Sequence, residues 1–356
     1  MNDLKEFTPV RLSSEADVVE SAGGKSEISK YAAPAEENLL TLKSANEWID
    51  IAKNDPVPNM LLGPLWHEGE LCILTADTNI GKSTLAVQIA DNISKGIGSK
   101  YLPFTAKPQD VIYGDFEFGY KQFENRYSDN YQNHYKFSNR LYRLEINQNF
   151  SQITDLNEKL LLDLEKLIVK TGAKVVIIDN LTYLRTQSMD TAKEALPLMQ
   201  QLKALKTKYG LSILVLGHTP KRSMYSPLTR NDIAGSKHLA NFADSIFAIG
   251  ESATDKSSRY IKQLKARATE IVFNEDNVLE CNIIKDHNCL KFEFTGTGNE
   301  RDHLKSEPQT AELEQRVLEI RKLKPYASLR DIAAELGTNQ VRVKRILDRN
   351  KHKFEP

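Results

Sequence analysis

The run Ile80-Gly81-Lys82-Ser83-Thr84 has the residue types and spacing of the second half of a phosphate-binding loop. Gly81 lets the backbone approach a polyphosphate, Lys82 supplies a positive charge to the β and γ phosphates, and Ser83 offers a hydroxyl to Mg²⁺. We therefore expect ATP and Mg²⁺ as cofactors. The predicted nucleotide-binding residues are Ala76, Asp77, Thr78, Asn79, Ile80, Gly81, Lys82, Ser83 and Thr84.

The first half of this loop departs from the motif G-x-x-x-x-G-K-[ST]. Ala76 stands where the motif has glycine, and Asp77 follows it. A carboxylate near phosphates costs binding energy unless it points away or meets the metal. The sequence therefore leaves the rate of hydrolysis open.

A second acidic signal comes from residues 174–180, where four aliphatic residues lead into Asp179. This is the form of a Walker B strand, whose aspartate holds the hydration shell of Mg²⁺ opposite the phosphate-binding loop. Ser83 and Asp179 are thus the predicted metal residues, although an aspartate after a core strand can also cap a helix. Asn180 follows, and an amide cannot abstract a proton. The available catalytic base is Glu117, two residues beyond Asp115 at the end of a predicted strand.

His218 follows another buried run, residues 211–216, and is expected at the same edge of the sheet. Such a histidine can sense the γ-phosphate or serve only the structure. A long basic segment follows at residues 221–237. Long loops inside compact domains tend to be functional or disordered, and the predicted DNA-binding residues here are Lys221, Arg222 and Arg230.

These residues need a parallel sheet to bring them together. Residues 71–74 form a short apolar run before the phosphate-binding loop, and the spacing after Ser83 predicts a helix with one buried face. Ligands of open parallel sheets lie at the carboxyl ends of the strands. We expect an α/β fold with a mostly parallel central sheet and edge hairpins at residues 278–284 and 290–294. Further strands are expected at residues 111–117, 141–146, 174–180, 211–216, 244–250 and 260–267, and helices at 120–127, 153–169 and 191–208.

Composition narrows the class of protein. The chain has 356 residues, and its 48 basic residues equal its 48 acidic residues, so contacts with nucleic acid must come from local patches. The three cysteines lack C-x-x-C spacing, which suits a reducing compartment. No apolar run reaches the roughly 18 residues of a membrane span, and the N-terminus lacks the apolar core of a signal peptide. We expect a soluble cytoplasmic protein without a membrane partner.

Outside the core, composition and periodicity predict four regions. Residues 1–38 are expected to be a disordered arm, and residues 39–60 a helical segment that covers its own sheet or docks on a neighbouring subunit. The ATPase core is assigned to residues 61–295, and a polar linker to residues 296–308.

Residues 309–356 are expected to form a small all-α domain. Ser328 and Gly337 mark the ends of its second helix, and the third helix is basic, which is typical of a helix-turn-helix. The alternative is a helical oligomerisation or lid domain. The predicted residues for duplex DNA are Arg342, Lys344, Arg345 and Arg349.

Taken together, these motifs resemble those of RecA-like P-loop ATPases of the AAA family that include the RepA-type hexameric replicative helicases of plasmids and mobile elements. The resemblance implies that Glu117 is the catalytic base, Asp179 the Walker B aspartate and His218 the strand-end histidine. It also implies that the pair in Lys265-Ala266-Arg267 acts across a subunit interface. The expected catalytic residues are therefore Lys82, Glu117, His218, Lys265 and Arg267.

The function that this resemblance implies is an ATP-hydrolysing, DNA-dependent motor, a RepA-like replicative or mobilisation helicase. It would be a homo-oligomer, a hexamer with ATP at the subunit interfaces and single-stranded DNA in a central channel. Two alternatives are an ATP-controlled DNA-binding regulator and a recombinase-like filament protein without unwinding activity. The sequence leaves open ring against filament, the polarity of unwinding, the DNA sequence preference and the host process.

Overall fold

The computed structural model describes residues 40–147, 156–180, 192–219, 225–232, 237–305 and 308–350. The arm expected at residues 1–38 therefore lies outside the described residues, as do Lys221 and Arg222. The chain divides into a unit of residues Met1–Pro56 and a unit of residues Val57–Pro356.

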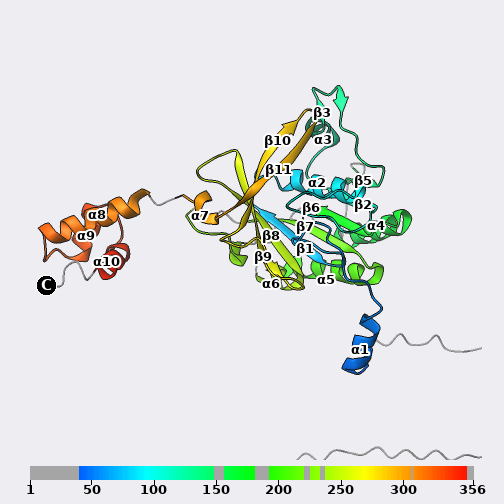
Figure 1. Ribbon diagram of the computed structural model, residues 1–356, viewed down its shortest axis with the longest axis horizontal. Helices are drawn as coiled ribbons and strands as arrows, with labels where there is room; N and C mark the ends of the chain where they lie inside the picture. The colour runs from blue at the N-terminus through cyan, green and yellow to red at the C-terminus, as the bar shows by residue number, and fades with distance from the viewer. Residues whose placement is uncertain are drawn as a thin grey trace, which may run out of the picture. The chain divides into compact units, whose positions relative to one another are not determined.

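A sheet of nine strands in the described residues forms the centre of the larger unit, in the order β11-β10-β9-β8-β1-β7-β6-β2-β5 (Figure 1). Six of its strands run parallel and three antiparallel strands extend one side. The predicted α/β fold with a mostly parallel sheet is confirmed. The parallel strands are β1 (Leu71–Ala76), β2 (Val111–Asp115), β5 (Leu141–Leu144), β6 (Val175–Asp179), β7 (Ser212–His218) and β8 (Ser245–Glu251), and the others are β9 (Ser258–Ala266), β10 (Val278–Asp286) and β11 (Cys289–Gly298).

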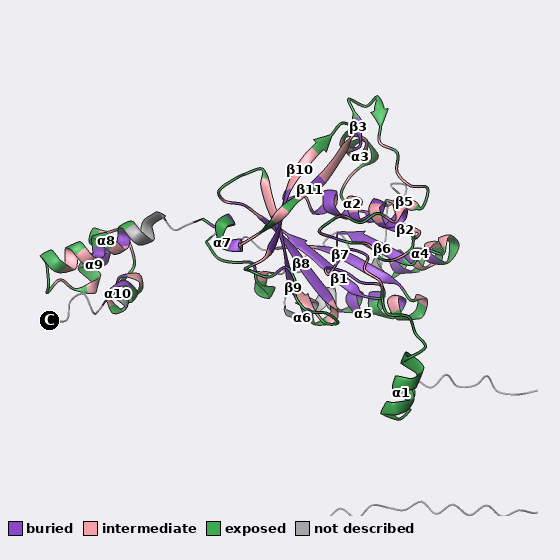
Figure 2. Cartoon of the chain, in the orientation of Figure 1, coloured by how far each residue is buried: buried purple, intermediate pink, exposed green. Residues whose placement is uncertain are grey.

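Helices bury both faces of this sheet. The helix α2 (Lys82–Lys95) packs on one face, whereas α4 (Leu156–Thr171), α5 (Ala192–Tyr209) and α6 (Lys237–Phe242) pack on the other. Alternate residues of β1 serve the two sides, since Cys72 and Leu74 belong to one core cluster and Leu71 and Ile73 to the other. Strands buried on both faces need continuous apolar runs, and this is why the strands were visible in the sequence (Figure 2).

Shorter elements complete the larger unit: α3 (Tyr120–Arg126), the hairpin of β3 (Ser128–Asp129) and β4 (Asn133–His134), the 3₁₀ turn η1 (Arg230–Asp232) and α7 (Glu300–His303). The helix α7 lies in the range expected as a polar linker, yet Glu300 is fully buried. Its carboxylate accepts hydrogen bonds from Lys262 Nζ at 2.5 Å and from the Leu228 amide at 2.7 Å. A buried carboxylate with charged and neutral donors anchors this segment, and composition alone gave no sign of it.

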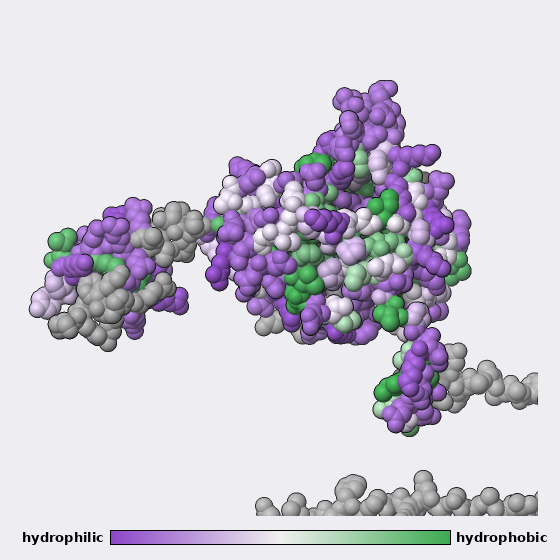
Figure 3. Space-filling view, viewed as in Figure 1, coloured by the Kyte–Doolittle hydropathy of each residue, from purple (hydrophilic) through white to green (hydrophobic). Residues whose placement is uncertain are grey.

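The helix of the smaller unit is α1 (Ala45–Ala52). Ser44 and Glu47 form a capping box at its start, which satisfies two backbone amides. Trp48, Ile49 and Ile51 on its apolar side are about half exposed, and hydrophobic atoms line one side of this helix in Figure 3. The expected helical segment is therefore present, with these three apolar side chains about half exposed.

The C-terminal part contains α8 (Pro308–Leu323), α9 (Leu329–Glu335) and α10 (Gln340–Arg349). Ser328 caps α9, Gly337 has φ +61° directly after it, and Asn339 caps α10. The three expected helices are present, and they share a core of their own, made by Leu313, Val317, Ile332, Ala333, Val343 and Ile346.

Lys344 and Arg345 of α10 are exposed and Arg342 is partly exposed, whereas the side chain of Arg349 lies outside what the structure describes. None of the helices in the described ranges is long and apolar enough to cross a membrane.

Candidate active site

The phosphate-binding loop connects the end of β1 to the start of α2. Gly81 has φ +105°, and a Cβ there would lie 2.5 Å from the Ile283 side chain and 3.0 Å from the Phe292 ring. Only glycine fits this position, because both the backbone angle and the close approach of the β10–β11 hairpin exclude a side chain. The first departure noted in the sequence, Ala76, is the last residue of β1 and is fully buried.

Lys82 turns back into this loop. Its Nζ atom donates to the carbonyls of Ala76 at 2.9 Å and Asp77 at 2.8 Å, and lies 3.2 Å from His218 Nδ1. Burial lowers the pKa of Lys82, while the charges of Asp179, Glu117 and Asp77 oppose this shift. The lysine is therefore a cation held inside a group of acids.

The strand register explains why distant residues meet here. Ala76 of β1 is paired with His218 of β7, and Asp115 of β2 with Asp179 of β6. The carboxyl ends of parallel strands meet at one edge of a sheet, which is the expected ligand edge. The structure thus brings together the loop, Asp179, His218 and the turn that carries Glu117.

Glu117 is hydrogen-bonded by the side-chain amide of Asn180, and its Oε1 atom lies 3.6 Å from His218 Nε2. Both ring nitrogens of His218 face nitrogen donors, since Lys82 Nζ lies 3.2 Å from Nδ1 and Asn180 Nδ2 lies 3.0 Å from Nε2. This imidazole is the main cause that holds the pKa of Glu117 below its ordinary value, and the Lys82 charge acts in the same direction. Glu117 is thus an ionised carboxylate able to accept a proton.

Asp115 has a different task. Both Nε and Nη2 of Arg143 donate to its Oδ2 atom, at 3.1 and 3.0 Å. Its Oδ1 atom accepts from the backbone amides of Glu117 at 3.3 Å and Phe118 at 2.9 Å. Asp115 is 2% exposed and shapes the turn that presents Glu117, so the geometry favours Glu117 as the base. No sequence motif indicates this role of Arg143, which is a single cation within a neighbouring predicted strand.

Asp179 and Ser83, the predicted metal residues, lie close enough for the Ser83 hydroxyl to stabilise the Asp179 carboxylate. Tyr113 OH donates to Asp179 Oδ2 at 2.7 Å, a contact that no sequence motif indicates. Burial raises the pKa of Asp179 to about 6, against the lowering effect of the Ser83 hydroxyl. A buried carboxylate beside a hydroxyl is an all-oxygen donor pair, which fits Mg²⁺. Two further hydroxyls in this region, those of Thr75 and Thr219, are buried without a hydrogen-bond partner in the described structure.

Lys265 and Arg267 lie at the opposite edge of the sheet. Ala266 pairs with Ser245, and Ser245 pairs with Cys72 near the start of β1. Lys265 Nζ donates to the carbonyls of Ala240 and Ala243, both at 2.7 Å, at the end of α6. Arg267 forms an ion pair with Asp244 at 3.0 Å, and its side chain remains 53% exposed.

The one predicted DNA-binding residue of the basic loop that the structure describes is Arg230. Its Nε atom donates to the Leu264 carbonyl at 2.6 Å, which fixes η1 against β9. The residue as a whole is exposed.

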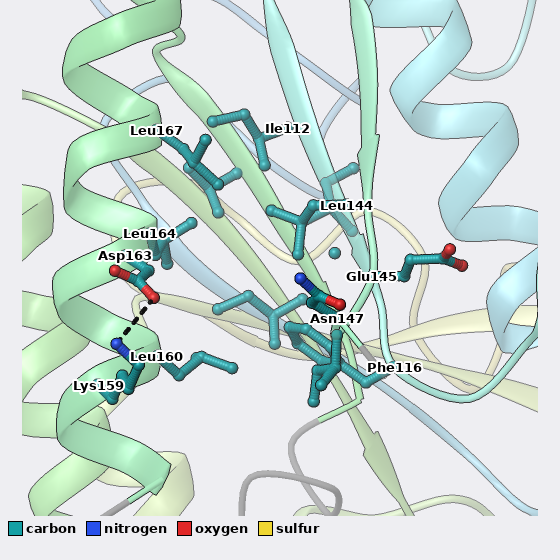
Figure 4. A pocket seen from close by; sticks show the side chains of 15 residues that line it. Ile112, Phe116, Leu144, Glu145, Asn147, Lys159, Leu160, Asp163, Leu164 and Leu167 are labelled. Carbon is teal, nitrogen blue, oxygen red and sulfur yellow. Dashed lines mark ion pairs between the residues drawn. The ribbon is translucent and has the colours of Figure 1, made fainter. Parts of the chain in front are cut away.

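A separate cavity of about 240 Å³ lies between α4 and strands β2, β5 and β6 (Figure 4). Its described lining is mainly aliphatic. Lys159 lies in this lining and is paired with Asp163 at 3.7 Å. This cavity therefore offers no phosphate-binding group comparable to Lys82 and does not extend the nucleotide site.

Comparison with known proteins agrees with this geometry. A family model described as "AAA domain" matches residues 35–224, more than half of the chain, and the match includes the phosphate-binding loop, Glu117, Asp179 and His218. The chain belongs to the AAA domain family. Together with the mostly parallel sheet, this membership identifies the core as a RecA-like P-loop ATPase.

Among solved structures, the chain is similar to a KaiC-like protein from Pyrococcus horikoshii OT3. The two share 12% sequence identity with a TM-score of 0.43, over 64% of this chain and 91% of the other. Comparison with curated proteins finds no match.

Proposed function

We propose that this ATPase is a DNA-dependent motor, a replicative or mobilisation helicase similar to the RepA type, with ATP bound between neighbouring subunits of a hexameric ring. The observation that carries the proposal is the separation of the expected catalytic residues. Lys82, Glu117, Asp179 and His218 share the carboxyl edge of the sheet, whereas Lys265 and Arg267 lie at the amino edge.

One subunit supplies most of the chemistry. Ser83 and Asp179 would hold Mg²⁺, which neutralises charge on phosphate oxygens when bound. Lys82 would face the phosphates of a bound ATP, and Glu117 would orient the attacking water and take its proton. His218 lies between Glu117 and Lys82, so its ring can report a change at the phosphates to the base.

Among the described residues, Lys82 is the cation held within the phosphate-binding loop at this edge. Arg143 is near, but Asp115 and the Phe118 carbonyl engage its guanidinium. In a ring of identical subunits with head-to-tail interfaces, one surface of each subunit meets a different surface of the next. Such an interface would place the half-exposed Arg267 of one copy at the phosphates of its neighbour, as an arginine finger.

The DNA contacts of the proposal rest on two basic segments. Lys221, Arg222 and Arg230 would contact single-stranded DNA in the channel. The exposed cations of α10 would contact the phosphates of duplex DNA, since Val343 and Ile346 of this helix pack inside the three-helix core while Lys344 and Arg345 are exposed.

The test measures ATP turnover with and without single-stranded DNA, the mass of the nucleotide-bound assembly, and strand displacement on a forked duplex. We expect DNA to stimulate turnover, a hexameric mass and ATP-dependent displacement. Turnover that ignores DNA, from a protein that stays monomeric at saturating ATP, would contradict the proposal. Stimulated turnover without strand displacement would leave an ATPase that coats or senses DNA.

A further inference from the structure

Asn180 directly follows β6, the strand that lies between β7 and β2 in the sheet. This strand order determines the neighbours of Asn180 at the carboxyl edge. His218 is the last residue of β7 on one side, and Glu117 lies two residues beyond the end of β2 on the other. Asn180 therefore stands between the predicted base and the histidine that contacts Lys82.

The side-chain amide of Asn180 contacts both neighbours through one atom. Its Nδ2 atom donates a hydrogen bond to Glu117 Oε1 and lies 3.0 Å from His218 Nε2. A primary amide carries two hydrogens on this nitrogen. One of them is engaged by the carboxylate, and the other is available to the imidazole when Nε2 carries no proton. One amide thus connects the base with the histidine.

The three side chains differ in exposure. Asn180 is 1% exposed, whereas the side chains of Glu117 and His218 are 36% and 27% exposed. The backbone beside Asn180 is also fixed, because the Phe116 amide donates to the Asp179 carbonyl at 2.8 Å and joins the turn after β2 to the end of β6. A partly exposed glutamate has several rotamers, and a donor held in the packed interior favours one of them.

We propose that Asn180 is a positioning residue for ATP hydrolysis, which holds the Glu117 carboxylate in the orientation that accepts a proton from the attacking water. The inference rests on the proposed role of Glu117 as the base. In the reaction one proton of the water passes to Glu117, and Asn180 itself neither gains nor loses a proton. Displacement of a reacting group by about 1 Å can reduce a rate about 10²-fold, so the hydrogen bond that orients the base has a measurable effect.

The experiment measures kcat and KM for ATP on the full-length protein with Asn180→Leu, which keeps the approximate volume of the side chain and removes its donor. We expect kcat to fall about tenfold to hundredfold. KM should stay nearly unchanged, because Asn180 lies outside the phosphate-binding loop. Unchanged kcat would overturn the proposal, as would a variant whose only defect is a raised KM.

A double-mutant cycle tests whether the effect passes through Glu117. In Glu117→Gln protein, adding Asn180→Leu should reduce single-turnover hydrolysis little further, because the base that Asn180 positions is already gone. If the two losses multiply instead, Asn180 acts on another group and the proposal is wrong. Tm shows whether Asn180→Leu is folded. Should it not fold, Asn180→Ala repeats the cycle without an apolar branch beside the carboxylate.

The matched control is Asn350→Leu in the C-terminal helices. Asn350 is 4% exposed, and its Nδ2 atom donates to Glu314 Oε1 at 2.6 Å, so it forms the same kind of amide–carboxylate contact. Its loss should lower the stability of these helices and leave kcat and KM unchanged. A similar fall in kcat for Asn350→Leu would reduce the effect of Asn180 to general destabilisation and overturn the proposal.

The same measurements separate this inference from the proposed function. If Glu117→Gln is inactive while Asn180→Leu is fully active, this inference alone is wrong. If Glu117→Gln keeps its turnover, the assignment of the base is wrong and the inference is wrong with it. Each variant is compared with the wild type both with and without single-stranded DNA, so a lack of stimulation by DNA would contradict the motor and not the role of Asn180.

Discussion

Lys82 and Lys265 form similar local contacts at opposite edges of one sheet. Each donates to two backbone carbonyls at a helix end or loop, and burial lowers the pKa of both. Their charged surroundings differ. Asp179, Glu117 and Asp77 raise the pKa of Lys82, whereas Arg267 and Arg230 lower that of Lys265 further, with Asp244 opposing them.

This difference distinguishes a binding site at the carboxyl edge of the sheet from a mainly structural set of contacts at the amino edge. At the carboxyl edge, several acidic side chains surround Lys82. A bound cation or phosphate would therefore find groups of opposite charge there. At the amino edge, Lys265 closes the end of α6, and Asp244 binds Lys206 and Arg267. Arg267 is half exposed, and the proposed ring would use it across a subunit interface. Four experiments test this division, in order of decreasing expected effect.

The largest effect is expected for Arg267→Ala, which should be inactive alone if the amino edge completes a neighbour's site. Arginine fingers contribute about 10³ to 10⁵ in rate. Mixed with Lys82→Ala protein under subunit exchange, Arg267→Ala should regain turnover, because some interfaces pair an intact loop with an intact finger. Arg140→Ala is the control, because it removes another exposed arginine and should stay active. Arg140 directly precedes β5 and donates to the Pro108 carbonyl.

Failure of the mixture to recover, while Arg267→Ala still assembles, would make Arg267 a residue of its own subunit's structure. The amino edge would then be wholly supporting, and the shared-site ring would lose its main argument.

Replacing each of the two neighbouring carboxylates with its amide sharpens the comparison. Glu117→Gln should bind Mg-ATP but lose about 10² to 10⁴ in turnover, since the amide keeps its shape yet cannot accept a proton. Asp115→Asn should instead lower stability by about 3 kcal/mol, because it removes the charge of the buried Asp115 carboxylate from its ion pair with Arg143. Measurements of turnover and Tm on both variants test this assignment. If Asp115→Asn loses turnover and Glu117→Gln loses stability instead, Asp115 is the base.

Lys82→Ala should reduce turnover by about 10² to 10³ while the protein stays folded, because its charge stabilises the phosphates in the transition state. Lys174→Ala is the matched control, since Lys174 donates to the Tyr209 carbonyl at 2.7 Å before β6. Near-normal turnover in folded Lys82→Ala would remove the distinction between the two edges and the phosphate-binding assignment with it.

The smallest effect concerns the C-terminal helices. Removing the residues after 307 should leave turnover largely intact, since Lys82, Glu117, Asp179, His218 and Arg267 all precede them. Duplex affinity should weaken, and the slope of log affinity against log salt should flatten by about one unit for each lost phosphate contact. Unchanged duplex affinity would assign these helices to another task.

Much of this site was determined by the sequence itself. The apolar run of β1, the glycine and lysine of the loop, and the aliphatic run before Asp179 are local patterns, because strand burial and helix periodicity repeat over a few residues. The carboxyl ends of parallel strands then predict that the loop, Asp179, Glu117 and His218 meet. The structure places them so.

Tertiary structure decided which neighbours those residues have. The choice between Asp115 and Glu117 depends on Arg143, which is 28 residues from Asp115 in the chain. Likewise, the burial of Glu300 depends on Lys262 and Leu228, 38 and 72 residues away. Such pairings follow from strand order and register, which long-range packing sets and no local pattern encodes. For the same physical reason, no local pattern shows that the Tyr127 hydroxyl is buried without a partner in the described structure, or that Arg267 lies at the edge of the sheet opposite Lys82.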